Sequence, residues 1–123
     1  MTTSIERTWT AICAAGAVPE WSGVAALLDS GAQVAIFRLP GDRWYALSNM
    51  DPASGAAVLS RGIVGDAGGV PVVASPLYKE RFDLRTGACL DAEGVSVEVY
   101  RVRVTGGILE VEAVEVEAPV DSP

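Results

Sequence analysis

Residues 72–87, VVASPLYKERFDLRTG, contain an apolar run, a proline-bearing loop and a short alternating segment that ends in a turn. Phe82 and Leu84 alternate with charged residues, and this spacing of two places both side chains on one face of a β-strand. Thr86-Gly87 then has the composition of a tight turn. The stretch therefore predicts a strand, a loop and a second short strand.

The rest of the chain repeats this pattern, with short apolar runs separated about every dozen residues by Gly, Pro, Asp or Ser. Helix is expected only as single turns around residues 14–21 and 52–60. Many short strands must close into a small barrel or sandwich to protect their edges. The sequence therefore predicts an all-β fold of short antiparallel strands with very little helix. Further strands are expected at residues 8–13, 23–29, 33–39, 43–49, 63–64, 95–104 and 108–118.

The clearest predicted hairpin joins residues 95–104 to residues 108–118 through Thr105-Gly106-Gly107. The apolar residues of its first strand change phase by one position between Val99 and Tyr100. In a half-buried strand such a shift predicts a β-bulge, because a bulge keeps both sets of side chains facing inward.

The 123 residues fit one domain, which we expect over residues 1–116, followed by an acidic, frayed C-terminal tail at residues 117–123. No apolar run approaches the roughly 20 residues of a membrane-spanning helix, and the first residues lack the pattern of a secretory signal. We therefore expect a cytoplasmic protein with no membrane partner.

Charge and residue counts exclude several classes of function. Sixteen acidic and nine basic residues give a net charge of −7, which disfavours binding to nucleic acid because such binding depends on cationic side chains. The chain has no histidine, so it lacks the usual general base near neutral pH and the commonest metal ligand. Cys13 and Cys89 are too few for a thiolate metal site without histidine, and we interpret them as small buried apolar residues.

Two loops carry a resemblance to a known family. Residues 46–62, ALSNMDPASGAAVLSRG, and residues 74–87, ASPLYKERFDLRTG, resemble the two cluster-binding loops of Rieske-type ferredoxin domains. In that family the loops lie at one end of a small β-sandwich and supply Cys-x-His and Cys-x-x-His to a [2Fe–2S] cluster. From Trp9 to about Ala113, the order of strands and loops is similar to that domain. The resemblance implies a small Rieske-type β-sandwich or barrel, with degenerate cluster loops at about 49–62 and 74–87.

The cluster ligands themselves are missing from these loops. The first ligand pair falls near Asp51 to Ser54, and the second falls on Ser75 and Tyr78. Their hydroxyl and carboxylate oxygens are hard donors, whereas a Rieske cluster requires two thiolates and two imidazoles. We therefore expect no metal, no cofactor and no catalytic residue in this chain.

Within that family the sequence is most similar to the small subunits of assimilatory NAD(P)H-dependent nitrite reductase, which lack the cluster. Ser48-Asn49, Asp51-Pro52, residues 58–65 (VLSRGIVG) and residues 74–77 (ASPL) carry this resemblance. It implies an accessory subunit of a cytoplasmic enzyme that reduces nitrite to ammonia in nitrate assimilation. The large subunit of that enzyme is expected to carry FAD, siroheme and an iron–sulfur cluster. This chain alone is expected to be non-catalytic and to act by contact with the large subunit.

Basic residues gather at the two loops, although the chain as a whole is acidic. Four of the nine basic residues lie in or beside the loops, whereas eight of the sixteen acidic residues occur from Asp91 onward. A locally basic end favours docking onto an acidic partner surface, and Tyr and Arg are enriched at binding hot spots. The expected partner interface comprises Asn49, Arg61, Pro76, Tyr78, Lys79, Arg81 and Arg85.

Two other functions stay open on the sequence alone. One is a Rieske-fold module without a cluster that binds a small ligand, or another oxidoreductase, through a vacated pocket lined by Asp51, Ser75 and Tyr78. The other is an electron-transfer ferredoxin with a bound cluster. Purely structural roles also stay open, in which Ser75 caps a turn and Tyr78 fills the volume left by the cluster.

Overall fold

The computed structural model describes residues 5–116, in which the strands pair antiparallel and helix is limited to two 3-10 turns, Ala15–Ala17 and Leu59–Arg61. This confirms the predicted all-β class. No helix within these residues is long and apolar enough to cross a bilayer. The tail predicted at residues 117–123 lies outside the described residues.

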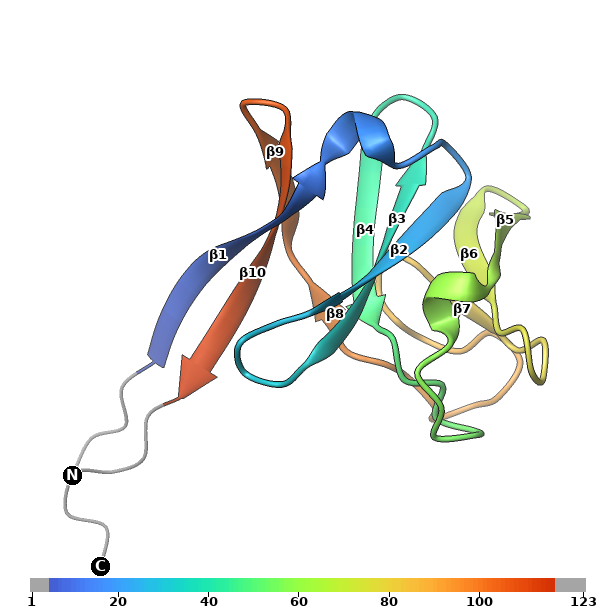
Figure 1. The fold of residues 1–123 in the computed structure, drawn as a ribbon. Coiled ribbons are helices and arrows are strands. Elements are labelled where there is room, and N and C mark those ends of the chain that lie inside the picture. The colour runs from blue at the N-terminus through green and yellow to red at the C-terminus, as the bar shows by residue number, and fades with distance from the viewer. Residues whose placement is uncertain (1–4, 117–123) are drawn as a thin grey trace, which may run out of the picture.

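The strands form three small sheets, arranged from left to right in Figure 1. The first sheet has the order β1-β10-β9 and contains Ile5–Ala14, Ile108–Val116 and Val102–Thr105. The second has the order β2-β3-β4-β8 and contains Ser22–Leu27, Gln33–Leu39, Arg43–Ser48 and Val99–Tyr100. The third has the order β5-β6-β7 and contains Ile63–Ala67, Val70–Ala74 and Arg81–Asp83.

Strand β3 lies between two hydrophobic cores. Its side chains alternate between opposite faces, as the period of a strand requires. Val34 and Ile36 pack in the first core, beside Leu109 of the first sheet. Phe37 packs in the second core, beside Phe82 of the third sheet. The second sheet is therefore covered on both faces, and the predicted inward face of Phe82 and Leu84 is confirmed.

The two cysteines belong to different cores. Cys13 packs against the first core and Cys89 against the second, and both are free thiols. Both pack against apolar cores as expected, but each is only partly buried, whereas the sequence predicts both as buried.

The predicted hairpin is correct at its tip and wrong along its first strand. β9 and β10 pair across Gly106-Gly107, which both have positive φ, as a two-residue hairpin turn requires. Residues 95–104 do not form one bulged strand, because β8 pairs with β4 whereas β9 pairs with β10. The phase change marks a crossing between sheets: Val97 packs against the second core, and Tyr100 packs against the first. The register shift of this sheet lies instead in β1, between Ala11 and Cys13.

Candidate functional site

Three successive turns, at residues 51–56, 75–80 and 83–88, share one pattern of hydrogen bonds. In each, the N–H of the first residue donates to the carbonyl of the sixth, at 2.8, 2.9 and 2.8 Å respectively. The carbonyl of the first residue accepts from the N–H of the fifth, at 2.7, 2.9 and 2.7 Å. Its side-chain oxygen accepts from the N–H of the third, at 2.9, 3.3 and 2.8 Å. Asp and Ser suit the first position because their short side chains bind nearby backbone groups.

The fifth residue of each turn adopts the left-handed conformation. Gly55 has φ 71°, Lys79 has φ 62° and Gly87 has φ 80°. Glycine is the ordinary choice for this conformation because a Cβ disfavours it. The 75–80 turn departs from the other two by placing a lysine there.

A buried hydrogen bond links the first two turns at their first residues. The Ser75 hydroxyl donates to Oδ2 of Asp51 at 2.5 Å. The two residues are 1% and 0% exposed. Oδ1 of Asp51 accepts from the N–H of Ala53, so both carboxylate oxygens have a partner. Two of the four positions predicted for degenerate ligands are thus brought into direct contact.

The other two predicted ligand positions lie apart from this contact. The Ser54 side chain accepts from the N–H of Ala56 within its own turn and is exposed. Tyr78 is 61% exposed, so the hypothesis that it fills the volume of a cluster is wrong. The hypothesis that Ser75 caps a turn is confirmed by its bond from the N–H of Leu77.

Asn49, expected at the partner interface, is buried inside the first loop. Its Oδ1 accepts from the N–H of Ser60 at 2.7 Å, and its carbonyl accepts from the N–H of Leu59 at 3.1 Å. Its own N–H donates to the carbonyl of Gln33. The residue fastens the first loop to β3, and its burial excludes it from a surface contact. That part of the interface prediction is wrong.

Two of the four basic residues at the loops are neutralised within the chain. The Arg81 guanidinium binds Asp91 through two nitrogens, at 2.8 and 3.1 Å. The Arg85 guanidinium binds Asp83 in the same way, at 3.1 Å for each nitrogen. The end of the molecule is therefore less basic than the sequence alone indicates.

The Arg81 pair gives a pH prediction. The hydrogen bond from Arg81 lowers the pKa of the Asp91 carboxyl from 3.8 to about 2. Because this pKa is depressed in the folded protein, the stabilisation is complete above about pH 4 and is lost as the pH falls toward 2. Arg81→Met is expected to raise the pKa of Asp91 toward its ordinary value, although the backbone N–H of residue 81 still donates to it. Carboxyl-carbon NMR titration measures this.

Asp83 is the internal control in the same titration. Its pKa is lowered by the hydrogen bond from Arg85, which Arg81→Met leaves in place. The pKa of Asp83 is therefore expected to stay unchanged. An Asp91 pKa that also stays unchanged would contradict the assigned ion pair.

Comparison with known proteins decides the family. The sequence matches the Rieske-like [2Fe-2S] domain over residues 8–112. A nitrite reductase (NADH) small subunit from Salmonella typhimurium is 44% identical over 103 residues, which cover 83% of this chain and 94% of that protein. The chain belongs to this family of Rieske-like small subunits.

Two further relatives extend the comparison. A crystal structure from Mycobacterium tuberculosis, named as an NADH-dependent nitrite reductase small subunit, has a TM-score of 0.85 and 50% sequence identity. The match covers 88% of this chain and 96% of that one. A nitrite reductase [NAD(P)H] large subunit from Klebsiella oxytoca is 48% identical over 101 residues. That match covers 82% of this chain but spans only 10% of the large subunit.

The donor set of this Rieske-like small subunit does not fit a [2Fe–2S] cluster. The loops offer a carboxylate and a hydroxyl at Asp51 and Ser75, and these groups bind each other. Cys89 packs against the second core, beyond the 83–88 turn. Among the side chains that the structure describes, no group of three or more Cys, Asp or Glu is placed to hold a metal ion. Thiolate and imidazole, which a Rieske iron pair requires, are both lacking at the loops.

Sequence reasoning missed the repetition of the turn in this small subunit. The segments DPASGA and DLRTGA both have Asp at the first position and Gly at the fifth. This spacing is a readable signal for the turn. The segment SPLYKE, residues 75–80, lacks the glycine, so this turn is recognised only from its hydrogen bonds.

Proposed function

We propose that this chain is the small subunit of a cytoplasmic NAD(P)H-dependent nitrite reductase and acts by contact with the large subunit. One observation carries the proposal: the match to a small subunit covers 94% of that protein. The buried bond between Asp51 and Ser75 supports a role without a redox centre. In it, the oxygen atoms at two of the predicted ligand positions bind each other. The reduction of nitrite to ammonia, with FAD, siroheme and an iron–sulfur cluster, is assigned to the large subunit.

The match to the Klebsiella protein supports contact with that partner. A segment similar to this chain makes up about a tenth of a protein named as a large subunit. In that protein the equivalent domain is covalently joined to the rest of the large subunit. A separate small subunit then replaces the covalent link with a docking surface.

The assembly experiment mixes the purified chain with purified large subunit. The isolated chain is expected to be colourless and free of iron by metal analysis. The mixture is expected to elute as one complex in size-exclusion chromatography, with an altered rate of nitrite-dependent NAD(P)H oxidation. A brown, iron-containing chain would establish the ferredoxin alternative, and separate elution with an unchanged rate would contradict the proposal.

A small-ligand module is the second candidate, and one observation favours it. A groove of about 600 Å³ is lined by residues that include Trp44, Val102 and Arg103. Clefts of this size with aromatic walls are typical of small-molecule sites. The groove does not involve Asp51 or Ser75, so it is not the vacated pocket that the sequence suggested. Retention of nucleotides or aromatic acids by the isolated chain in equilibrium dialysis would support this candidate over the subunit.

A further inference from the structure

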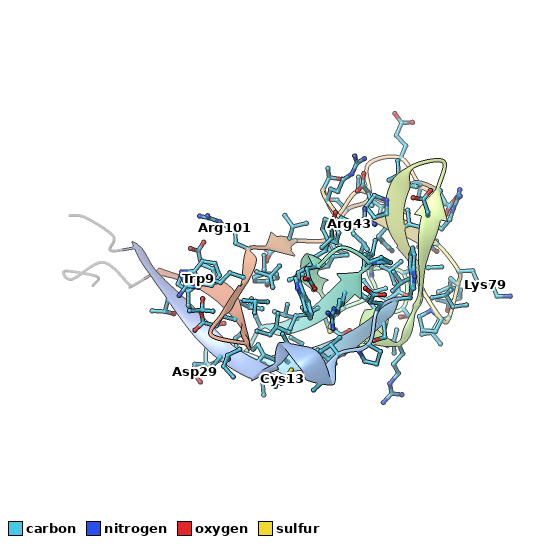
Figure 2. All side chains as sticks on the ribbon, turned by 90° about the horizontal axis from the view of Figure 1, so that it is seen from above. Trp9, Cys13, Asp29, Arg43, Lys79 and Arg101 are labelled. Atoms are coloured by element: carbon cyan, nitrogen blue, oxygen red, sulfur yellow. The ribbon has the colours of Figure 1, made fainter. Side chains whose placement is uncertain are left out.

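The tip of the 75–80 turn, residues 77–79, presents apolar and charged side chains to solvent. Leu77 is 51% exposed and Tyr78 is 61% exposed. Lys79 points away from the body, at the end of the molecule far from Trp9 (Figure 2). Large apolar side chains at a turn tip gain nothing from exposure, whereas Tyr is a frequent anchor in protein interfaces.

Lysine is an unusual residue at position 79 because the backbone there is left-handed. Lysine at φ 62° is disfavoured relative to glycine, which occupies the same position of the other two turns. The Lys79 side chain makes no hydrogen bond or ion pair with any group that the structure describes, although its backbone N–H donates to the carbonyl of Ser75 within the turn. Residues other than glycine that are held in this conformation cluster at functional positions.

The charges at this end distinguish Lys79 from its neighbours. Arg81 and Arg85 are each held by an aspartate of the same chain. Lys79 and Arg61 have no such partner within the described part of the chain. Of the four basic side chains at the two loops, Lys79 and Arg61 therefore keep a positive charge that no described carboxylate pairs with, in a chain whose net charge is −7.

We propose that the 77–79 tip inserts into an apolar pocket with an acidic rim on the large subunit. The inference rests on the proposed function and names the partner surface that it requires. Leu77 and Tyr78 supply the apolar anchor, and Lys79 pairs with a carboxylate on the rim. Charge complementarity favours an acidic partner surface, because the exposed Lys79 ammonium at the tip has no carboxylate partner in the described part of the chain.

The test separates the use of the lysine charge from its effect on the fold. Lys79→Gly removes the charge and relieves the backbone, so its Tm is expected to equal or exceed that of the unaltered chain. Binding to the large subunit is nevertheless expected to weaken about tenfold at low salt. Lys79→Arg is expected to bind like the unaltered chain, since it keeps the charge. Tyr78→Ala is expected to weaken binding about 30-fold with little change in Tm.

Arg101→Gln is the matched control, because it removes one positive charge at a site away from the tip. It is expected to bind like the unaltered chain in the same titration. Equal binding by the unaltered chain, Lys79→Gly and Tyr78→Ala would overturn this inference and leave the proposed function standing. A lower Tm for Lys79→Gly would also overturn it, because the lysine would then serve the fold. Absence of binding by the unaltered chain would overturn the proposed function and this inference together.

Discussion

Gly87→Ala is expected to lower the free energy of unfolding by about 3 kcal/mol or more. A Cβ at this position would lie 2.1 Å from the carbonyl oxygen of Val97. The residue also has φ 80°, which an alanine adopts only with strain. Relief requires moving the 83–88 turn away from Val97, whose N–H donates to the carbonyl of Gly87 at 2.9 Å. The substitution therefore damages the contact between the turn and the second core.

Gly55→Ala is the matched control for this effect. Gly55 has the same place in its own turn and φ 71°, but an added Cβ would meet nothing within 4 Å. Its expected cost is the left-handed conformation alone, about 1 kcal/mol. Urea denaturation of both variants measures the difference. Equal losses would show that the contact with Val97 is not what requires glycine at position 87.

The strands were largely predictable from the sequence because the pattern of period two is strong where one or both faces are buried. β3 and β4 were predicted within a residue of their observed bounds. The failure at residues 95–104 has a physical cause. A phase change in an apolar pattern can arise from a β-bulge within one sheet or from a chain that crosses from one sheet to another. The local sequence does not distinguish these two structures. Only the pairing of β8 with β4 decides for the crossing.

The candidate site was less predictable than the fold. The loops and two of their central residues, Asp51 and Ser75, were identified from their positions, but their mutual hydrogen bond depends on contact across 24 residues. The internal pairing of Arg81 is a tertiary contact of the same kind, formed with Asp91 across ten residues. The sequence gives the number of basic side chains near a loop. Whether each one is free to bind a partner protein depends on which carboxylates the fold brings beside it.

Self-contained turns account for how the loops keep their shape without a cluster. Each turn closes through backbone bonds and one short polar side chain, so the N–H groups of its first, third and fifth residues are satisfied without an external ligand. The bond between Asp51 and Ser75 is then a direct, buried link between the two loops.

The strength of this link is expected to appear in a double-mutant cycle. Asp51→Ala is expected to lower the free energy of unfolding by about 3 kcal/mol, because it removes the acceptor for two donors and leaves a buried space. Ser75→Ala is expected to cost about 2 kcal/mol, because a buried carboxylate oxygen loses its partner. The double variant is expected to cost about 1 to 2 kcal/mol less than the sum, since neither partner is then left unpaired.

Urea denaturation of the four proteins measures this coupling, and Ser54→Ala serves as the control. Its hydroxyl accepts only a local bond in an exposed turn, so about 0.5 kcal/mol or less is expected. Additive losses at Asp51 and Ser75, within about 0.3 kcal/mol, would show that the bond contributes nothing beyond two separate turn caps. A coupling of the expected size would instead establish that a buried carboxylate and hydroxyl hold the two loops together.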